Sequence, residues 1–371
     1  MTRGVGRLVL GLVVVSSCQA VDKPVRYIAE RVYDQPIIRG DEVAAGGIGQ
    51  TEGRNNYRGN AMFPTLVKIP DWAPERPDPR AQYYLYFAPH KGTTINVAWA
   101  DRVDAQKWTF FNTETEKAAG VPGRGVFDLN LSEGDRRFEL APGVLMENHI
   151  SSPHVYVDDD NQRFILIMHA ATDGAGQKSF MATSRTGLNF NAPELGGEPG
   201  CGPVRRHFSQ TTYLHIFDFR AGLLGVGRSG RFTRPNNPGA PWDAVGSGPL
   251  WESSESCPIS RAEVKAGVKE GEVYRHGSVF VRGSAIDLFY SRGLDGENEH
   301  LLQATIDASS EDWETWSIQA KPETLMRPEL DWEQPTMHDS FVYESNGQLY
   351  LFYSAGPSGE DSIGLATLKQ R

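Results

Sequence analysis

Histidine side chains stand at the beginnings of several short apolar segments, where a fold could bring them together. His276 and His338 each come directly before such a segment, and His149 and His154 lie five residues apart around a third. Histidine titrates near neutral pH, so it can act as an acid, act as a base or ligate a metal. Asp339, directly after His338, is the only carboxylate at these segment starts. The pattern predicts an acid–base site.

The candidate catalytic residues are Asp339, His338, His276, His154 and His149. Of the last two we expect one to be functional and not both, because their odd spacing places them on opposite faces of a strand. Two alternatives stay open. The pair His276 and His338 would only hydrogen-bond neighbouring units or hold a structural ion, or Asp339 would only orient one of these two histidines.

The composition limits the classes of function. The chain has 371 residues, 39% of them apolar, and a formal charge of −10. This apolar fraction is adequate for a folded core, and the acidic balance argues against a nucleic-acid partner, which would need a positive surface. No run of about 18 apolar residues is present to span a membrane. The 39 Gly and 23 Pro favour many turns and short strands.

Residues 1–20 read as an export signal. Arg3 and Arg7 precede a short apolar run, and the run ends in Val-Ser-Ser-Cys at Cys18. This ending predicts a lipoprotein anchored through Cys18, whereas simple cleavage near Ala20 is the alternative. Both place the protein in the periplasm or at the cell surface, and in the lipoprotein a lipid on Cys18 is the sole link to the membrane. Cys201 and Cys257 then form a disulfide or remain separate thiols.

A repeat of strand-like segments organises residues 21–371. Five apolar runs recur, at 83–88, 164–169, 223–228, 286–291 and 349–354. Before each lies a first strand whose start we place near residues 64, 153, 211, 277 and 339. Such units cannot bury both faces alone, and radial stacking around an axis solves this. We predict a single all-β domain, a five-bladed β-propeller closed by residues 26–38, with a β-sandwich as the alternative.

The segments "YYLYFA", "LYLFYSA", "FMATSRTGLNF" and "SSPHVYVDDDNQ" resemble the five-bladed propeller glycosidases. That group includes arabinanases, β-xylosidases, fructosidases and neoagarobiose hydrolases, and the resemblance covers most of residues 55–371. It implies carboxylates acting as base, modulator and acid at the innermost strand starts of the first three blades. This chain has Phe63-Pro64, Ser152-Pro153 and Gln210-Thr211 there, so that triad cannot be transferred. The resemblance alone suggests a divalent cation such as calcium in the channel.

The third blade carries a distinct charge, with six arginines and one aspartate between residues 201 and 240. Guanidinium groups bind carboxylate or sulfate in a bidentate manner, which suggests an acidic carbohydrate. Pairing of these arginines with the acidic surplus elsewhere is the competing interpretation. The candidate substrate-binding residues are Arg275, Arg228, Glu333, Trp332 and Gln210.

We therefore expect an exported glycoside hydrolase that acts on a polysaccharide or oligosaccharide with acidic groups. Asp339 and a histidine at the strand starts around the axis would share the acid and base roles. One alternative is a polysaccharide lyase, in which histidine abstracts the proton beside a uronate and arginine neutralises the carboxylate. The other is a surface glycan-binding propeller without catalysis.

Overall fold

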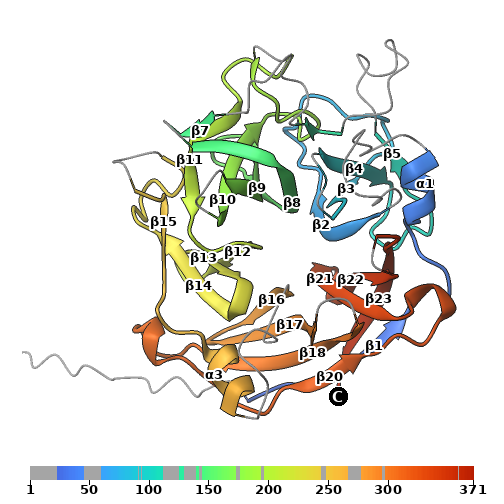
Figure 1. Cartoon of the computed structure of the whole chain (residues 1–371), viewed down its shortest axis with the longest axis vertical. Coiled ribbons are helices and arrows are strands. Elements are labelled where there is room, and N and C mark those ends of the chain that lie inside the picture. Colours follow the sequence, from blue (N-terminus) through green and yellow to red (C-terminus); the bar gives the residue numbers. More distant parts are fainter. Residues whose placement is uncertain are drawn as a thin grey trace, which may run out of the picture.

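The computed structural model is a ring of five antiparallel sheets around a central axis (Figure 1). It describes residues 23–45, 60–90, 92, 94–111, 125–128, 139–141, 144–172, 176–193, 196–243, 248–265, 277–294, 297–357 and 359–371. The predicted five-bladed β-propeller is confirmed, and the alternative of a β-sandwich is wrong.

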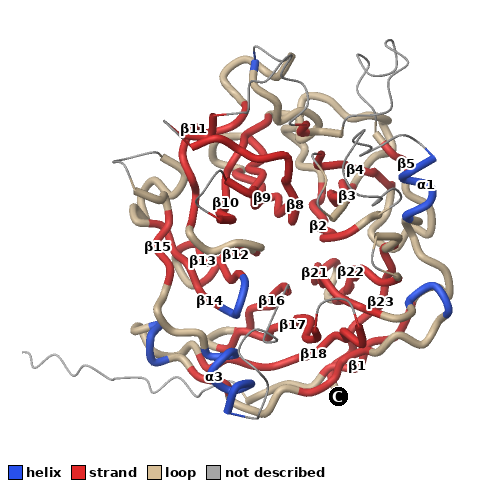
Figure 2. Tube along the Cα trace, viewed as in Figure 1, coloured by secondary structure: helices blue, strands red, loops and turns tan. Residues whose placement is uncertain are grey.

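Each blade is a meander whose first strand lies nearest the axis (Figure 2). The innermost strands are β2 (Met62–Lys68), β8 (Val144–Asp158), β12 (His215–Phe219), β16 (Gly277–Arg282) and β21 (Thr336–Ser345). The second strands are β3 (Tyr83–Ala88), β9 (Arg163–Thr172), β13 (Gly222–Gly227), β17 (Ala285–Leu294) and β22 (Gln348–Gly356). All five apolar runs of the repeat therefore form second strands, as predicted.

The outer part of each blade is more varied. The third strands are β4 (Thr94–Ala100), β10 (Gly176–Ser184), β14 (Arg231–Pro235), β18 (Glu297–Asp307) and β23 (Ser362–Gln370). The fourth strands are β5 (Thr109–Phe110), β11 (Gly202–Ser209), β15 (Trp251–Ser253), β19 (Ser317–Ile318) and β1 (Tyr27–Arg31). Three further short strands are β6 (Phe127–Asp128), β7 (Glu139–Ala141) and β20 (Glu323–Met326), which pair with β4, β8 and β18.

The described residues form few helices. They are α1 (Gly40–Ala45), α3 (Pro258–Lys265) and the 3₁₀ turns η3 (Arg228–Gly230), η5 (Trp313–Thr315) and η6 (Asp331–Glu333). Among the described residues, no helix is long and apolar enough to cross a bilayer. Cys201 and Cys257 are both free thiols, so the disulfide alternative is not realised.

The N-terminal strand closes the ring, as the sequence predicts for residues 26–38. Strand β1 pairs antiparallel with β23, from Tyr27 opposite Gln370 to Arg31 opposite Ala366, and so completes the sheet of the last blade. Figure 1 shows this blue strand beside the red C-terminal strands. The first and last parts of the chain therefore share one sheet, which joins the two ends of the ring.

The core lies between blades, and this explains why the second strands are apolar on both faces. Along β3, Tyr84 and Tyr86 belong to the cluster shared with the second blade, whereas Leu85 and Phe87 belong to the cluster shared with the fifth. Side chains alternate across a strand, so each sheet buries one face against each neighbour. Five such clusters hold the ring together.

Candidate functional site

The innermost strands of the first, second and fifth blades share an irregular start that turns side chains toward the axis. In the first blade Met62 pairs with Ala88 and Thr65 with Tyr86, so two residues bulge out opposite one. The same shift occurs at Ser151 to His154 and at His338 to Phe341. A β-bulge of this kind bends the strand and re-aims a side chain.

The first residue of each bulge adopts a left-handed backbone conformation. The φ angles are 58° at Phe63, 51° at Ser152 and 48° at Asp339, and Tyr213 in the third blade has 57°. Such values are rare for residues other than glycine, above all for bulky ones, and strained positions cluster at functional sites. Four blades thus present equivalent side chains at the axis.

This geometry corrects the residue at which the first strand was expected to start in two of the five blades. In the third blade β12 begins at His215, so the strand start is Tyr213 and not Gln210. Gln210 is exposed, lies 3.3 Å from His207 (Nε2 to Nε2) and does not line the axial pocket.

The second correction concerns the fifth blade, whose start lies at Asp339 and not at His338. Ser278 pairs with Phe289 just as Phe341 pairs with Phe352, so Gly277 corresponds to Ser340. The predicted equivalence of His276 with His338 is therefore wrong by one position, and in sequence count His276 corresponds to Asp339. His276 and Arg275 lie outside the described residues, as do the side chain of His149 and Cys18.

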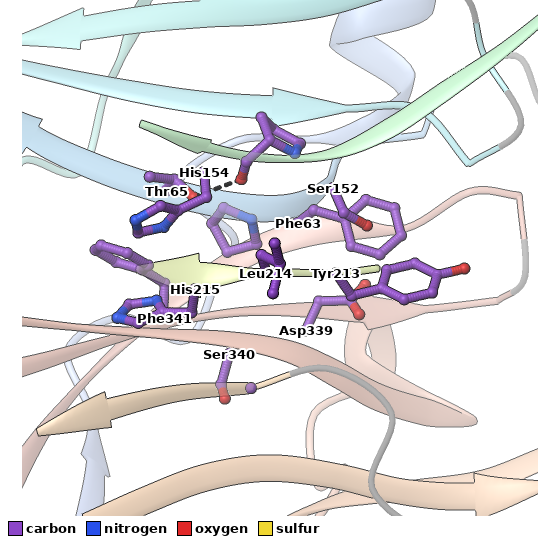
Figure 3. Close-up of a pocket in the computed structure, with 13 residues that line it drawn as sticks. Phe63, Thr65, Ser152, His154, Tyr213, Leu214, His215, Asp339, Ser340 and Phe341 are labelled. Atoms are coloured by element: carbon purple, nitrogen blue, oxygen red, sulfur yellow. Dashed lines mark hydrogen bonds between the residues drawn. The ribbon is translucent and has the colours of Figure 1, made fainter. Parts of the chain in front are cut away.

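All five blades contribute to a narrow pocket of about 40 Å³ on the axis. Figure 3 shows Phe63, Ser152, Tyr213 and Asp339 toward one end and His154, His215 and Phe341 toward the other. A cavity needs only about 10–15 Å³ of such volume to hold one water molecule, so this pocket admits a few waters but not a sugar ring. A sugar would have to bind at the mouth, on the side of the strand starts.

Asp339 is the only carboxylate among the described residues that line this pocket. Its Oδ2 lies 2.6 Å from Nδ1 of His338, and Nε2 of the same ring lies 2.8 Å from Oδ1 of Asp361. Asp361 also accepts hydrogen bonds from Asn60 Nδ2 and, at 3.2 Å, from the Gly359 amide. His338 is thus held between two carboxylates, and the structure brings together two of the predicted catalytic residues.

His338 is charged in this arrangement. Burial disfavours the imidazolium, but the charges and hydrogen bonds of Asp339 and Asp361 outweigh burial and raise the pKa of His338 well above its ordinary value. Both ring nitrogens then donate to carboxylates, so both N–H groups of His338 are engaged and its ring holds the Asp339 carboxylate in place. The sequence analysis missed Asp361, because the loop that carries it, Ser358-Gly359-Glu360-Asp361, looks like an ordinary polar turn.

His154 lies deeper and is neutral. Its ring centroid is 4.6 Å from that of His215 and 6.2 Å from that of Phe341, and only 4% of the residue is exposed. Burial lowers the pKa of His154 to about 4, although a backbone hydrogen bond with Ile216 opposes this. Burial and the neighbouring His154 also lower the pKa of His215. The pair forms part of the floor of the pocket.

His215 was missed because the third blade was read three residues too early. With the corrected frame it stands two residues after Tyr213, as His154 stands two residues after Ser152. The equivalent residue of the first blade is Thr65, whose hydroxyl donates to the carbonyl of Pro153 at 2.7 Å (Figure 3).

Glu333 and Trp332 do not line the axial pocket. Glu333 is fully buried and accepts hydrogen bonds from Arg31 Nε at 2.7 Å and from the Tyr353 hydroxyl at 2.9 Å. Trp332 stacks on Tyr353, with ring centroids 6.0 Å apart, and its Nε1 donates to the carbonyl of Asp34. Both join the N-terminal segment to the last blade, and neither lies at the axial pocket where we expected substrate to bind.

The arginines of the third blade divide into two groups. Arg220 pairs with Glu311 at 3.2 Å and Arg234 with Glu252 at 2.6 Å, which agrees with the competing interpretation that they meet acidic partners. Arg228 is exposed, and its guanidinium lies 5.8 Å from the ring centroid of Tyr213. No ion pair of Arg228, a predicted substrate-binding residue, occurs among the described residues.

The residues of the channel do not fit calcium. Calcium takes six to eight oxygen ligands, with carboxylates prominent among them. The axial pocket offers imidazole and phenyl rings, four hydroxyls and one carboxylate, which is already bonded to His338. Within the described ranges, no group of three or more His, Cys, Asp or Glu side chains could hold a metal ion.

Several solved glycoside hydrolases share this fold. An α-L-arabinanase of Cellvibrio cellulosa, complexed with arabinohexaose, matches with a TM-score of 0.52 and 13% identity, over 84% of this chain and 92% of that one. An α-L-arabinofuranosidase of Lactobacillus brevis gives 0.52 and 13%, over 83% and 90%. A β-xylosidase/α-arabinofuranosidase from a compost microbial metagenome, with xylotriose and free of calcium, gives 0.51 and 12%, over 92% and 96%.

The amino-acid sequence itself gives no such match. No protein-family model matches the chain, and no curated protein matches it in sequence. At this level of identity the similarity shows that the chain has the five-bladed propeller fold of these glycoside hydrolases, as its strand motifs predicted.

Proposed function

We propose that this protein is a glycoside hydrolase that cleaves an oligosaccharide or polysaccharide at the mouth of its axial pocket. The observation that carries the proposal is Asp339, a carboxylate at a left-handed strand start on the axis. The shared propeller fold supports it, since the arabinanase with that fold was solved with arabinohexaose bound. A fold alone does not define a reaction, so the assignment depends on this side chain.

The surroundings of Asp339 suit a base. The imidazolium of His338 donates to its Oδ2 and thereby favours the ionised carboxylate and fixes its orientation. In the proposed reaction Asp339 accepts a proton from water, the water oxygen attacks the anomeric carbon, and the bond to the leaving oxygen breaks. We assign the proton for the leaving oxygen to His276, a prediction from sequence count that lies outside the described residues.

The test is the release of new reducing ends from a broad panel of oligosaccharides. Loss of a general base costs about 10²- to 10⁴-fold in rate, so Asp339→Asn should lose that much activity while still binding the oligosaccharide. Asp160→Asn is the matched control, because Asp160 is exposed in the hairpin between β8 and β9, at the opposite end of its blade. Full activity of Asp339→Asn would contradict the assignment.

A second candidate is a glycan-binding propeller without catalysis. The observation that favours it is the presence of Phe63, Ser152 and Tyr213 at the strand starts where the resemblance implies base, modulator and acid. Binding without new reducing ends over the whole panel would select this function. The comparisons give the lyase alternative no support, and products that absorb in the ultraviolet would be needed to restore it.

Export and lipidation remain proposals that rest on the sequence of residues 1–20. The basic residues, the apolar run and the Val-Ser-Ser-Cys ending support a lipid anchor at Cys18. Mass spectrometry of the protein recovered from cell membranes should show an acylated N-terminal cysteine. Cys18→Ala should move the protein to the soluble fraction, and an unmodified membrane-free protein with Cys18 intact would contradict the proposal.

A further inference from the structure

Two side chains at the strand-start end of the third blade are held together by the backbone. The amide of Arg228 donates to the carbonyl of Thr212 at 2.9 Å, and Thr212 directly precedes Tyr213. The Arg228 guanidinium lies 5.8 Å from the centre of the Tyr213 ring, a cation–π separation. A cation and an aromatic ring are therefore presented side by side, and the ring lines the axial pocket.

Tyr213 is positioned by all three of the first blades. Its ring centroid lies 4.3 Å from that of His169 in the second blade and 6.2 Å from that of Phe63 in the first. Its hydroxyl donates to Oε1 of Gln177 at 3.4 Å. Figure 3 shows the ring extending away from the buried histidines toward the mouth. A fixed and half-exposed ring at a mouth is suited to pack against the apolar face of a sugar.

Arg228 differs from two other arginines of its blade. Arg220 and Arg234 each meet a glutamate, whereas no ion pair of Arg228 occurs in the part of the chain that the structure describes. The chain has 47 acidic residues and a net charge of −10. An anion therefore needs a local positive site to bind near this pocket, and Arg228 supplies one. A guanidinium presents a fork of N–H donors that matches a carboxylate or a sulfate.

We infer that Tyr213 and Arg228 form a subsite for an anionic sugar, a residue that carries a carboxylate or a sulfate ester. The sugar ring packs on Tyr213 at the pocket mouth, and its anionic substituent accepts hydrogen bonds from Arg228. This deepens the proposed function, on which it rests for the placement of a glycan at this mouth, because it names the class of substrate.

The test is calorimetric binding of oligosaccharides to the full-length protein, which needs no turnover. The probes are oligogalacturonates, oligosaccharides that contain glucuronate, their methyl esters, sulfated galactan oligosaccharides and neutral xylo- and arabino-oligosaccharides. Methyl esters keep the sugar and remove the charge. A hydrogen bond to a charged group corresponds to about a tenfold or larger change in affinity, so an acidic probe should bind at least tenfold more tightly than its ester or neutral counterpart. Preference for the uronates or for the sulfated probes identifies the substituent.

The variants separate charge from folding. Arg228→Gln should remove the preference for the acidic probe and leave binding of the ester unchanged, whereas Arg228→Lys should keep part of it. Arg220→Gln is the control, because Arg220 lies at the opposite end of the same blade, between β12 and β13. Tyr213→Ala should weaken charged and neutral probes alike. Equal thermal unfolding temperatures show that the variants are folded.

Each negative result identifies whether the anionic subsite or the hydrolase activity is wrong. If neutral probes bind and are cleaved as well as acidic ones, and Arg228→Gln changes neither, the subsite is overturned and the hydrolase stands. If no acidic probe binds, the subsite is also overturned. If an acidic probe binds through Arg228 but no reducing ends appear, the subsite stands and the hydrolase falls.

Discussion

The axis of this propeller contains two groups of buried histidines that differ in charge: one is protonated and the other is neutral. His338 on β21 lies between Asp339 and Asp361, and its pKa is raised. His154 and His215, on β8 and β12, pack against one another, and their pKa values are lowered. All three are less than 9% exposed. Burial alone therefore does not decide the charge of a histidine here; the partner does.

This difference divides the pocket. On the fifth-blade side the imidazolium of His338 lies between Asp361 and Asp339 and holds Asp339 in place. On the side of the second and third blades the neutral rings of His154 and His215 close the floor together with Phe341. Among the described residues that line the pocket, the charged group thus lies on one wall, that of the candidate base. The two walls should respond in opposite ways to mutation and to pH.

The largest effect is expected when the charged group loses a partner. Asp361→Ala leaves the buried imidazolium with one carboxylate, and breaking a buried pair costs about 3–5 kcal/mol of unfolding free energy. Because the folded-state pKa of His338 is raised, its stabilisation is complete below about pH 6.5 and is lost as the pH rises through the folded value. Urea unfolding at pH 6 should show the full penalty, and more alkaline solution should reduce it.

The double variant Asp361→Ala with His338→Leu provides the control for that measurement. Removal of the imidazolium should recover part of the lost stability, because no unpaired charge is then left buried. A penalty below about 1 kcal/mol for Asp361→Ala at pH 6, comparable to an exposed pair, would show that His338 is not charged.

The sequence was sufficient for the fold and for one wall of the site. Five apolar runs predicted the second strands, since each must be buried on both faces, and Asp339 and His338 were found because they directly precede such a segment. Asp361 lies 23 residues from His338 in sequence, and only the pairing of β21, β22 and β23 brings them together. His215 was missed because the third blade was read three residues too early, and the left-handed residue Tyr213 that marks the strand start has no periodic signature.

A second effect on the unfolding free energy, with the opposite pH dependence, is expected from the wall formed by the neutral His154 and His215. The pKa of His154 is lowered to about 4, so the unfolded chain binds a proton on it that the folded chain rejects. Stability is therefore present above about pH 6.5 and is lost as the pH falls toward 4, by up to about 3 kcal/mol at 1.36 kcal/mol for each pKa unit. His154→Phe keeps a ring of similar size and should remove this part of the acid sensitivity.

The measurement is the unfolding free energy of the wild type and of His154→Phe at pH 7 and pH 4. Carboxylates contribute to acid unfolding in both proteins, so the difference between the two pH dependences isolates the histidine. In Asp361→Ala, measured in the same way, the loss of unfolding free energy between pH 7 and pH 4 should not become smaller. If His154→Phe loses as much stability on acidification as the wild type does, then the ring is already charged in the fold, and the contrast between the walls disappears.

The smallest effect concerns a neutral hydrogen bond that should not depend on pH at all. The Thr65 hydroxyl donates to the carbonyl of Pro153 at 2.7 Å and joins the first two blades, as the Ser340 hydroxyl joins the fifth to the fourth through Phe289. Thr65→Val should cost about 1 kcal/mol at pH 5 and pH 8 alike, with Ser340→Ala as its counterpart beside the charged wall. Neither partner of the Thr65 hydrogen bond titrates. If the loss of unfolding free energy in Thr65→Val depended on pH, the charge of His338 or His154 would have to influence this bond from across the pocket, and the two walls would not be electrostatically independent.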